Sequence, residues 1–338
     1  MMLRQPSVKA LLWAALLVLA STLWPAHSAR ATVRCTASMT NLNFGSVNLV
    51  AGTGLSATAT LSYTCTNDVT TATYARVCFN IGDGAQSLTY FTPRRMNNVL
   101  QFQIYHSSGA TIWGSRANST VPNPYTVDIT IPAKSTAGNG TYSGTTAMQG
   151  VILTGQAAQS PGSYQNQFTG GHTAISWSSN TSTAPTNCAG TTQNNFPFTA
   201  LATVVKACTV VAGSASNIVM GPVSSTATNV AGNNSIAVTC SGSTPYNIGL
   251  APSNGSTTGA GEMSGTGSNT DKVPYQLRST TGTGGTIWGN TATASLVGNG
   301  VAGSGSGVAT SVPVYVTVPS ANYQPDTYTD TVTVNVWY

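Results

Sequence analysis

The sequence predicts an all-β protein made of two tandem immunoglobulin-like β-sandwiches, the second of which lacks its final strand. Three observations lead to this fold class: apolar and polar residues alternate along many short segments, one series of landmarks occurs twice, and the two copies end differently. Charged residues make up only 6% of the 338 residues, against about 25% in ordinary soluble domains. Thr, Ser, Asn and Gly are abundant instead, which favours strands and tight turns.

The first 31 residues have the features of a secretory signal. Arg4 and Lys9 give a positive start, residues 10–23 form an apolar run, and small residues before position 32 offer a cleavage site. The run is too short to span a bilayer, and no later segment is long enough. We therefore expect export and a mature chain that begins at Thr32, without a membrane span. The alternative is a leader that is retained as an N-terminal anchor.

The charge of the mature chain would be close to neutral. Loss of Arg4, Lys9 and Arg30 with the leader would leave nine basic and seven acidic side chains. Such a balance lacks the electrostatic footprint of a nucleic-acid-binding protein, so we expect no nucleic-acid partner.

The six cysteines all follow the leader, and an even number in an exported chain predicts disulfides. No two of them have the C-x-x-C spacing that zinc or redox sites use, and we expect no metal. Pairing within each copy would join Cys35 to Cys65 and Cys208 to Cys240. Cys78 and Cys188 remain, and we pair them by elimination.

The chain contains one pattern twice. The landmarks occur in the same order in both copies, which indicates two copies of one domain. We place these domains at residues 32–206 and 207–338. The paired landmarks are Cys35-Thr36 with Cys208-Thr209, Tyr63-Thr64-Cys65 with Val238-Thr239-Cys240, Ile112-Trp113-Gly114 with Ile287-Trp288-Gly289, Thr130-Ile131-Pro132 with Thr317-Val318-Pro319, and Gly140-Thr141-Tyr142 with Asp326-Thr327-Tyr328.

The segments within each copy have the period of two that is typical of strands with one buried face. Val127, Ile129 and Ile131 alternate with polar residues in the first copy, and the valines from 312 to 318 do so in the second. Gly- and Asn-rich turns separate such segments, which favours an antiparallel sandwich.

The two copies end differently, and this difference carries the main functional prediction. The second copy stops within an alternating strand whose inward residues would be Val332, Val334, Val336 and Tyr338. The first copy continues for about fifty residues after residues 141–153, which we take as the equivalent strand, and closes with an alternating strand at residues 196–205. The inward residues of that closing strand would be Phe196, Phe198, Ala200, Ala202 and Val204.

A sandwich without its final strand exposes core side chains and unpaired backbone groups along a groove. We therefore expect the first domain to be completed by its own strand at 196–205. The second domain should accept a strand from another chain, a known mode of recognition.

These features together resemble spore coat protein U-like domains, the subunit domains of archaic chaperone–usher pili. The resemblance rests on the Cys-Thr openings, the second Cys some thirty residues later, the Ile-Trp-Gly motif and the terminal stretch from Asp326 to Val334. It covers both copies. The additional Cys78 and Cys188 and the long insertion in the first copy depart from it.

The resemblance implies a pilin-type fold and a place at the tip of a fibre. Subunits of this family carry a donor strand before the first Cys, whereas only Thr32, Val33 and Arg34 precede Cys35 here. A subunit that accepts a strand and donates none caps a fibre, as two-domain tip adhesins do. The implied partners are a periplasmic chaperone, an outer-membrane usher and an adjacent pilin. The implied role is attachment and biofilm formation at the cell surface, through contact with a surface or a receptor.

Aromatic residues in the insertion between Thr154 and Asn195 are candidates for an adhesive loop. Tyr164, Phe168 and Trp177 lie there among Gly, Ser, Asn and Gln, and aromatic side chains on loops suit binding sites. We place this connection at the end of the first domain that is remote from the second, together with residues 66–73. The alternative is that the three aromatic residues pack against their own domain.

Catalytic chemistry has few candidate residues. His106 and His172 are the histidines that follow the leader, and Glu262 is the sole glutamate. Residues 298–303 match a dinucleotide fingerprint, but no helix follows them. We expect neither an enzyme nor a cofactor. A secreted carbohydrate-degrading enzyme is disfavoured because no pair of carboxylates stands out. A structural coat or matrix protein of the spore coat U type, without a specific receptor, remains the alternative function.

Overall fold

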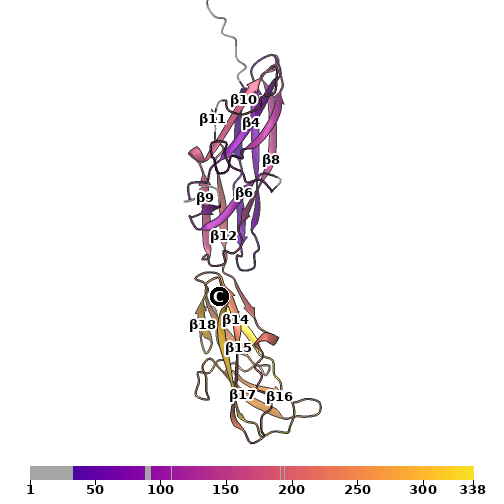
Figure 1. Ribbon diagram of the computed structural model, residues 1–338. Coiled ribbons are helices and arrows are strands. Elements are labelled where there is room, and N and C mark those ends of the chain that lie inside the picture. Colours follow the sequence, from indigo (N-terminus) through magenta and orange to yellow (C-terminus); the bar gives the residue numbers. More distant parts are fainter. Residues whose placement is uncertain (1–32, 88–92, 108, 191, 194) are drawn as a thin grey trace, which may run out of the picture.

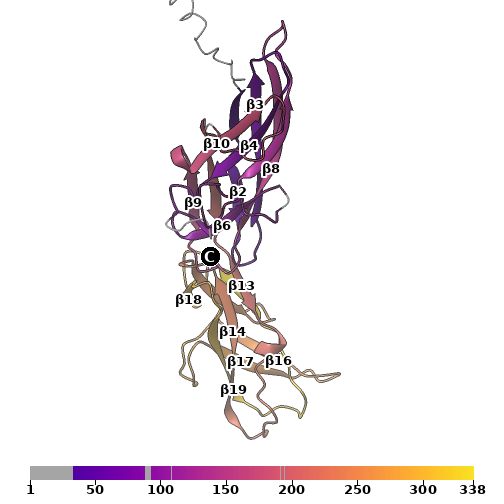
Figure 2. The same ribbon diagram turned by 45° about the horizontal axis from the view of Figure 1, so that its top comes forward.

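A computed structural model describes residues 33–338, except for 88–92, 108, 191 and 194. The predicted leader at residues 1–31 lies outside this range. The chain forms two all-β domains that lie end to end (Figures 1 and 2). Domain 1 runs from β1 (Val33–Met39) to β12 (Phe198–Val204), and domain 2 runs from β13 (Cys208–Val211) to β20 (Thr333–Trp337). Within the described residues, no helix is long and apolar enough to cross a membrane.

Domain 1 is a sandwich of one five-stranded sheet against two smaller sheets. The sheet orders are β1-β3-β8-β6-β5, β11-β10-β4-β7 and β2-β12-β9. The remaining strands are β2 (Leu42–Val47), β3 (Ser56–Asn67), β4 (Thr73–Ile81), β5 (Arg94–Met96), β6 (Leu100–Tyr105), β7 (Tyr125–Ile131), β8 (Gly140–Ile152), β9 (Gly162–Phe168), β10 (Thr173–Asn180) and β11 (Thr192–Gln193), and the short 3-10 helix η1 (Gly170–His172) joins β9 to β10.

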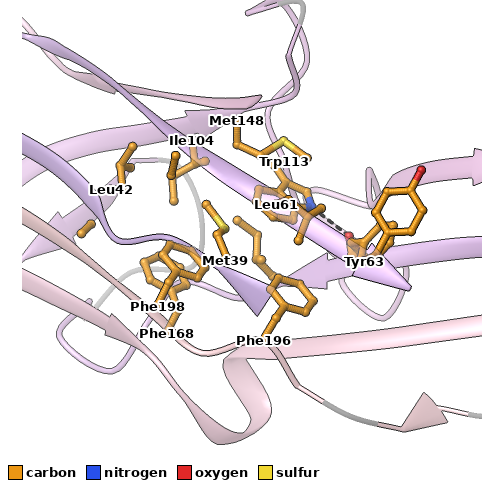
Figure 3. Packing of buried hydrophobic residues seen from close by; sticks show 14 of the residues in the cluster. Met39, Leu42, Leu61, Tyr63, Ile104, Trp113, Met148, Phe168, Phe196 and Phe198 are labelled. Atoms are coloured by element: carbon orange, nitrogen blue, oxygen red, sulfur yellow. Dashed lines mark hydrogen bonds between the residues drawn. The ribbon is translucent and has the colours of Figure 1, made fainter. Parts of the chain in front are cut away.

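The core of domain 1 lies between these layers. Tyr63 of β3 contacts Phe79 of β4 with ring centroids 5.1 Å apart, and Phe102 of β6 meets Phe168 of β9 at 6.5 Å. Trp113 is fully buried, and its indole N–H donates to the Phe79 carbonyl at 2.8 Å (Figure 3). The inward side chains therefore join all three sheets into one core.

Domain 2 repeats the larger sheet of domain 1 in the same order, as β13-β14-β19-β17-β16, and faces it with β18-β15-β20. The prediction of two all-β sandwiches is confirmed. The strands not yet bounded are β14 (Thr228–Cys240), β15 (Pro245–Ala251), β16 (Ala260–Ser264), β17 (Lys272–Arg278), β18 (Val301–Ser304) and β19 (Thr310–Ser320), and η2 (Ser214–Ser216) is a short 3-10 helix.

The two tryptophan motifs occupy the same place in the two domains. The Trp113 amide donates to Ile104 O at 2.8 Å, and the Trp288 amide donates to Leu277 O at 3.0 Å. The Trp288 indole N–H donates to the Ile248 carbonyl of β15, as Trp113 does to β4. These bonds align β6 with β17 and β4 with β15.

Strand pairing corrects part of the repeat proposed from the sequence. β8 lies between β3 and β6, and β19 lies between β14 and β17, so β8 corresponds to β19. Matching Thr130-Ile131-Pro132 of β7 to Thr317-Val318-Pro319 of β19 was therefore wrong, as was matching residues 141–153 to the last strand of domain 2. Short Thr-apolar-Pro segments mark the end of a strand but do not say which strand it is. The last strand, β20, pairs with β15 as β10 pairs with β4.

All six cysteines pair as expected. Cys35–Cys65 and Cys208–Cys240 join directly opposite residues of adjacent strands, β1 to β3 and β13 to β14. Cys78–Cys188 instead ties β4 to the segment between β10 and β12. The third disulfide therefore restrains the connection that leads into β12.

The junction between the domains is short and closely packed. Only residues 205–207 separate β12 from β13. The Gly242 amide of domain 2 donates to the Ala157 carbonyl of domain 1 at 2.9 Å. A Cβ atom at Gly242 would lie 1.9 Å from Ala158 O, and one at Gly307 would lie 2.2 Å from Ala158 N. Two glycines thus allow the backbones of the two domains to touch.

Candidate functional site

β12 completes the first sandwich. It pairs in parallel with β2 and antiparallel with β9, placing Phe198 opposite Phe168 and Ala202 opposite Tyr164. The five side chains predicted to point inward are at most 4% exposed. They are Phe196, Phe198, Ala200, Ala202 and Val204.

Two aromatic side chains fix this segment in the core (Figure 3). The Phe196 ring stacks on Trp113 at 5.9 Å and 5°, and it meets Phe79 edge-on at 6.0 Å. The Phe198 ring stacks on Phe168 at 4.4 Å. Burial of a large apolar side chain stabilises a fold by about 1.5–3 kcal/mol. The segment from 196 to 204 is therefore an integral part of domain 1.

The corresponding edge of domain 2 is open. β20 pairs with β15 on one side, and among the described residues no strand pairs with its other side. Val332, Val334 and Val336 are half-buried against the core of domain 2. Tyr338, which was predicted to point inward with them, is 45% exposed. We call residues 328–336 the open edge.

Matching hydrogen bonds align the open edge with β9. The Tyr164 hydroxyl donates to Ser160 O at 2.6 Å, and the Tyr328 hydroxyl donates to Gln324 O at 2.7 Å. Such a bond from a Tyr to the backbone a few residues upstream resembles the tyrosine corner of immunoglobulin-like sandwiches.

A second pair of bonds gives the same alignment. The Asn97 amide donates to Gln165 O and the Ser264 amide donates to Thr329 O, both at 2.9 Å. Val332 therefore corresponds to Phe168, the residue on which Phe198 stacks.

The segment before β14 takes the place of β2. In domain 1, a Cβ atom at Gly150 would touch Leu42 and Phe44. In domain 2, a Cβ atom at Gly232 would touch Ile218 and Met220. The two glycines lie on different strands of corresponding pairs. Gly150 of β8 is opposite Ala57 of β3, whereas Gly232 of β14 is opposite Val316 of β19.

Ile218 and Met220 thus correspond to Leu42 and Phe44. Unlike β2, however, residues 217–223 belong to no sheet, and Val219 is 81% exposed. By this correspondence, residues 218–220 and the open edge flank the position that β12 fills in domain 1.

The proposed adhesive loop is wrong as a site. Tyr164 and Phe168 lie in β9 and Trp177 lies in β10, and they are 8%, 0% and 5% exposed. The Trp177 indole N–H donates to Val33 O at 3.1 Å. Their composition suggested a loop, but Tyr164, Asn166 and Phe168 have the period of two of an inward-facing strand. The alternative, that they pack against their own domain, is the correct one.

Exposed loops do lie at the end of domain 1 remote from the junction. They comprise residues 68–72, 132–139 and 181–190. The buried Asn67 amide donates to Thr71 O and Pro132 O, and the Lys134 amide donates to Val69 O. We call these three segments the distal loops.

The third distal loop is also tied to β4. Cys188 is bonded to Cys78, and the Arg76 guanidinium donates to Thr186 O at 2.6 Å. The same guanidinium binds both carboxylate oxygens of Asp128 and holds the pKa of that carboxyl below its usual value. The loops are polar and are held by hydrogen bonds from Asn67, Lys134 and Arg76 and by one disulfide.

Two titratable side chains of domain 1, Arg94 and His172, have structural partners. Arg94 is fully buried and donates to Gly82 O, Gln103 Oε1 and Trp113 O, and burial lowers its pKa to about 9. His172 Nδ1 lies 3.4 Å from Asp83 Oδ1. The described residues contain no cluster of three His, Cys, Asp or Glu side chains suited to a metal ion. Residues 298–303 form a turn and the start of β18, so the fingerprint there is not followed by a helix.

The chain is similar in fold to several solved adhesins. The tip subunit in a chaperone–tip subunit pre-assembly complex of archaic Csu pili of Acinetobacter baumannii has 15% identity and a TM-score of 0.47, with 90% of this chain and 100% of that chain covered. The CupB6 tip adhesin of Pseudomonas aeruginosa has 11% identity and a TM-score of 0.35, with 90% and 95% covered. The adhesive subunit CfaE of enterotoxigenic Escherichia coli has 8% identity and a TM-score of 0.30, with 88% and 92% covered. No curated protein matches the chain.

The family is shown by the sequence itself. The family model of the Spore Coat Protein U domain matches twice, at residues 22–170 and 194–335. The second match begins before β12 and ends within β20, so it contains the closing strand of domain 1 and domain 2 up to residue 335. The chain belongs to the Spore Coat Protein U domain family.

Proposed function

We propose that the protein is the tip subunit of a chaperone–usher pilus and that domain 2 accepts a strand from the next subunit. One observation supports this most: of two domains of the same family, the first is completed by a strand that has no counterpart in the second. β12 lies between β2 and β9 in domain 1. No described residues take that position in domain 2.

The open edge has the properties of a strand acceptor. On the side of β20 away from β15, no strand among the described residues pairs with its backbone, and Val332, Val334 and Val336 are only half-buried. An added strand would pair with the backbone and cover these side chains, which is the usual basis of strand addition. By analogy with β12 and β9, the incoming strand would run antiparallel to β20.

The partners follow from this role. A domain with an open edge pairs readily with other chains, so a periplasmic chaperone would cover the edge before assembly. An outer-membrane usher would then exchange the chaperone for the adjacent pilin. The protein would be exported through the periplasm to the cell surface, where domain 1 would form the outermost part of the fibre.

Domain 1 would carry the adhesive surface, which promotes attachment and biofilm formation. The distal loops are better candidates for that surface than the buried Tyr164, Phe168 and Trp177. They are exposed, lie opposite the junction, and are restrained by Cys78–Cys188 and by Arg76. Restraint before binding reduces the entropy that a loop loses on contact with a receptor.

A structural coat or matrix component is the second candidate, because the family takes its name from the spore coat. Immunogold electron microscopy of cells that express the chain with its chaperone and usher separates the two. A tip subunit gives single gold particles at fibre ends. Labelling along the shafts, or of a coat without fibres, would contradict the tip assignment.

A further inference from the structure

We infer that Asp330 selects the incoming strand by requiring a short hydroxyl side chain, Thr or Ser, at the inward position opposite it. This position corresponds to Ala200 of β12. The inference rests on the proposed strand acceptance by domain 2 and adds to it the chemistry of the partner.

The corresponding position in domain 1 has no such requirement. Asn166, which is opposite Ala200, is fully buried. Its amide nitrogen donates to Asp83 O at 2.8 Å and to Arg95 O at 3.0 Å, and its oxygen accepts from the Gln86 amide at 3.1 Å. Because domain 1 itself provides partners for both polar atoms of this side chain, an apolar alanine can cover it.

Asp330 takes the place of Asn166 in domain 2. It lies two residues after Tyr328 and two before Val332, so it shares their inward face. The core residue Tyr275 donates its hydroxyl to Asp330 Oδ2 at 2.5 Å, and the Thr331 amide donates to Oδ1 at 2.8 Å. Leu277 corresponds to Ile104, because each accepts a bond from the backbone amide of the tryptophan in its own domain. Tyr275 and Phe102 lie two residues earlier in these strands and therefore correspond as well. A carboxylate and a phenol thus occupy positions that hold an amide and a phenyl ring in domain 1.

Insertion of a strand would remove water from this carboxylate. Asp330 is only half-buried while the edge is open, and each of its oxygens accepts one bond from the protein. Two further lone pairs would be left without partners beneath an apolar strand, and burial of an unsatisfied charged group is costly. A hydroxyl directly opposite could donate one hydrogen bond to this carboxylate.

The neighbouring positions limit the size of that side chain. In domain 1 the residue opposite Phe168 is a Phe, whereas Ala occupies the positions opposite Asn166 and Tyr164. Domain 2 has Val332, Asp330 and Tyr328 at these places. The incoming strand should therefore carry a larger apolar residue, then Thr or Ser, then a small residue, at alternate positions. A strand whose inward residues are all apolar, such as β12 of another copy, would be rejected because it leaves two lone pairs of a buried carboxylate without donors.

The test extends residues 32–338 beyond Tyr338 by a short Gly/Asn turn and a copy of residues 196–205. The C-terminus lies near the domain junction (Figures 1 and 2), where a strand antiparallel to β20 would begin. Two versions carry Ala200→Thr or Ala200→Val within the added copy, and these two side chains are nearly equal in size. A Thr199→Val change at the neighbouring outward position serves as the control.

We expect the Thr version to raise the Tm of domain 2 above that of the Val version by roughly 3 °C or more. In an Asp330→Ala chain the order should reverse, because the hydroxyl then lacks its partner. The outward change should leave the ranking unaltered.

A Val version as stable as the Thr version, or a preference for Thr that persists in Asp330→Ala, would overturn the inference while leaving strand acceptance intact. If no extension raises the Tm of domain 2, the proposed acceptor role is wrong and the inference falls with it.

Discussion

The ring of Phe198 lies flat on the ring of Phe168, with the centroids 4.4 Å apart and the planes 5° apart. This contact joins β12, the last strand of domain 1, to the antiparallel strand β9. In domain 2, Val332 has the place of Phe168, and the described residues provide no counterpart of Phe198. Domain 1 thus contains both members of the pair. Domain 2 contains a counterpart only of the residue in β9.

Replacement of Phe198 by Ala should destabilise domain 1 by about 3–5 kcal/mol, because it leaves a cavity beside Phe168. Chemical denaturation of the full chain, followed by the fluorescence of Trp113 and Trp177, measures the loss. Thr199→Ala is the matched control, since Thr199 is the outward neighbour, and should change stability by less than about 0.5 kcal/mol. Equal effects of the two substitutions would show that β12 is not part of the core.

Removal of β12 should prevent domain 1 from folding independently. Residues 32–206 should form a monomer with a cooperative thermal transition, whereas residues 32–194 should aggregate or be digested rapidly. The physical reason is the loss of several buried side chains from a domain whose total stability is about 5–15 kcal/mol. A shortened chain that melts cooperatively at an unchanged temperature would contradict the role of β12 in completing domain 1.

The disulfide Cys78–Cys188 should stabilise the third distal loop. It spans 110 residues, and loss of such a link costs about 2–4 kcal/mol. Cys78→Ala with Cys188→Ala should lower the Tm of domain 1 and make residues 181–195 the first site of limited proteolysis. Cys208→Ala with Cys240→Ala should affect domain 2 alone. Thiol labelling of the denatured, unreduced wild-type chain should find no free cysteine.

Asp326 should stabilise domain 2 at neutral pH and lose this effect in acid. Hydrogen bonds from the Thr266 hydroxyl, the Asn269 amide and the Thr266 and Thr327 backbone amides hold its pKa well below the usual value. A carboxyl whose pKa is lowered on folding contributes stability above its unfolded pKa of about 3.9, and this stability is lost as the pH falls through the folded pKa.

The Asp326→Asn chain should therefore melt below the wild type at pH 7, and the gap should shrink at about pH 2.5. Glu262→Gln, which removes an exposed carboxylate from β16 of the same domain, is the control and should have little effect at either pH. A gap that is independent of pH would mean that the charge of Asp326 is not responsible.

The sequence predicted the strands and the inward residues of β12 because period-two alternation directly reports one buried face. It failed for Tyr164, Phe168 and Trp177 because the Gly, Ser and Asn around them suggested a loop, although the same alternation was present. It also mismatched β7 with β19, since strands of one sandwich have similar ends and only their pairing distinguishes them.

Asp330 was not recognised as a site residue for a related reason. Its significance depends on its correspondence with Asn166 and on the hydroxyl of Tyr275, which lies 55 residues away in the sequence. Neither relationship is visible without the pairing of β5 with β6 and of β16 with β17. The available signal was the position of Asp330 two residues before Val332, since an alternating strand places such residues on the same face.

We expect the open edge of β20 to accept a strand. The direct test is amide hydrogen exchange of residues 32–338, measured with and without a saturating ten-residue peptide. The peptide carries apolar residues at alternate positions and Thr at the position opposite Asp330. Exchange at residues 328–336 and 217–220 should slow strongly when the peptide is present. Exchange in β9 and β12 of domain 1 should not change. Strand acceptance would be contradicted if the peptide left exchange at residues 328–336 unaltered. It would also be contradicted if residues 328–336 were as protected as β9 in the absence of the peptide.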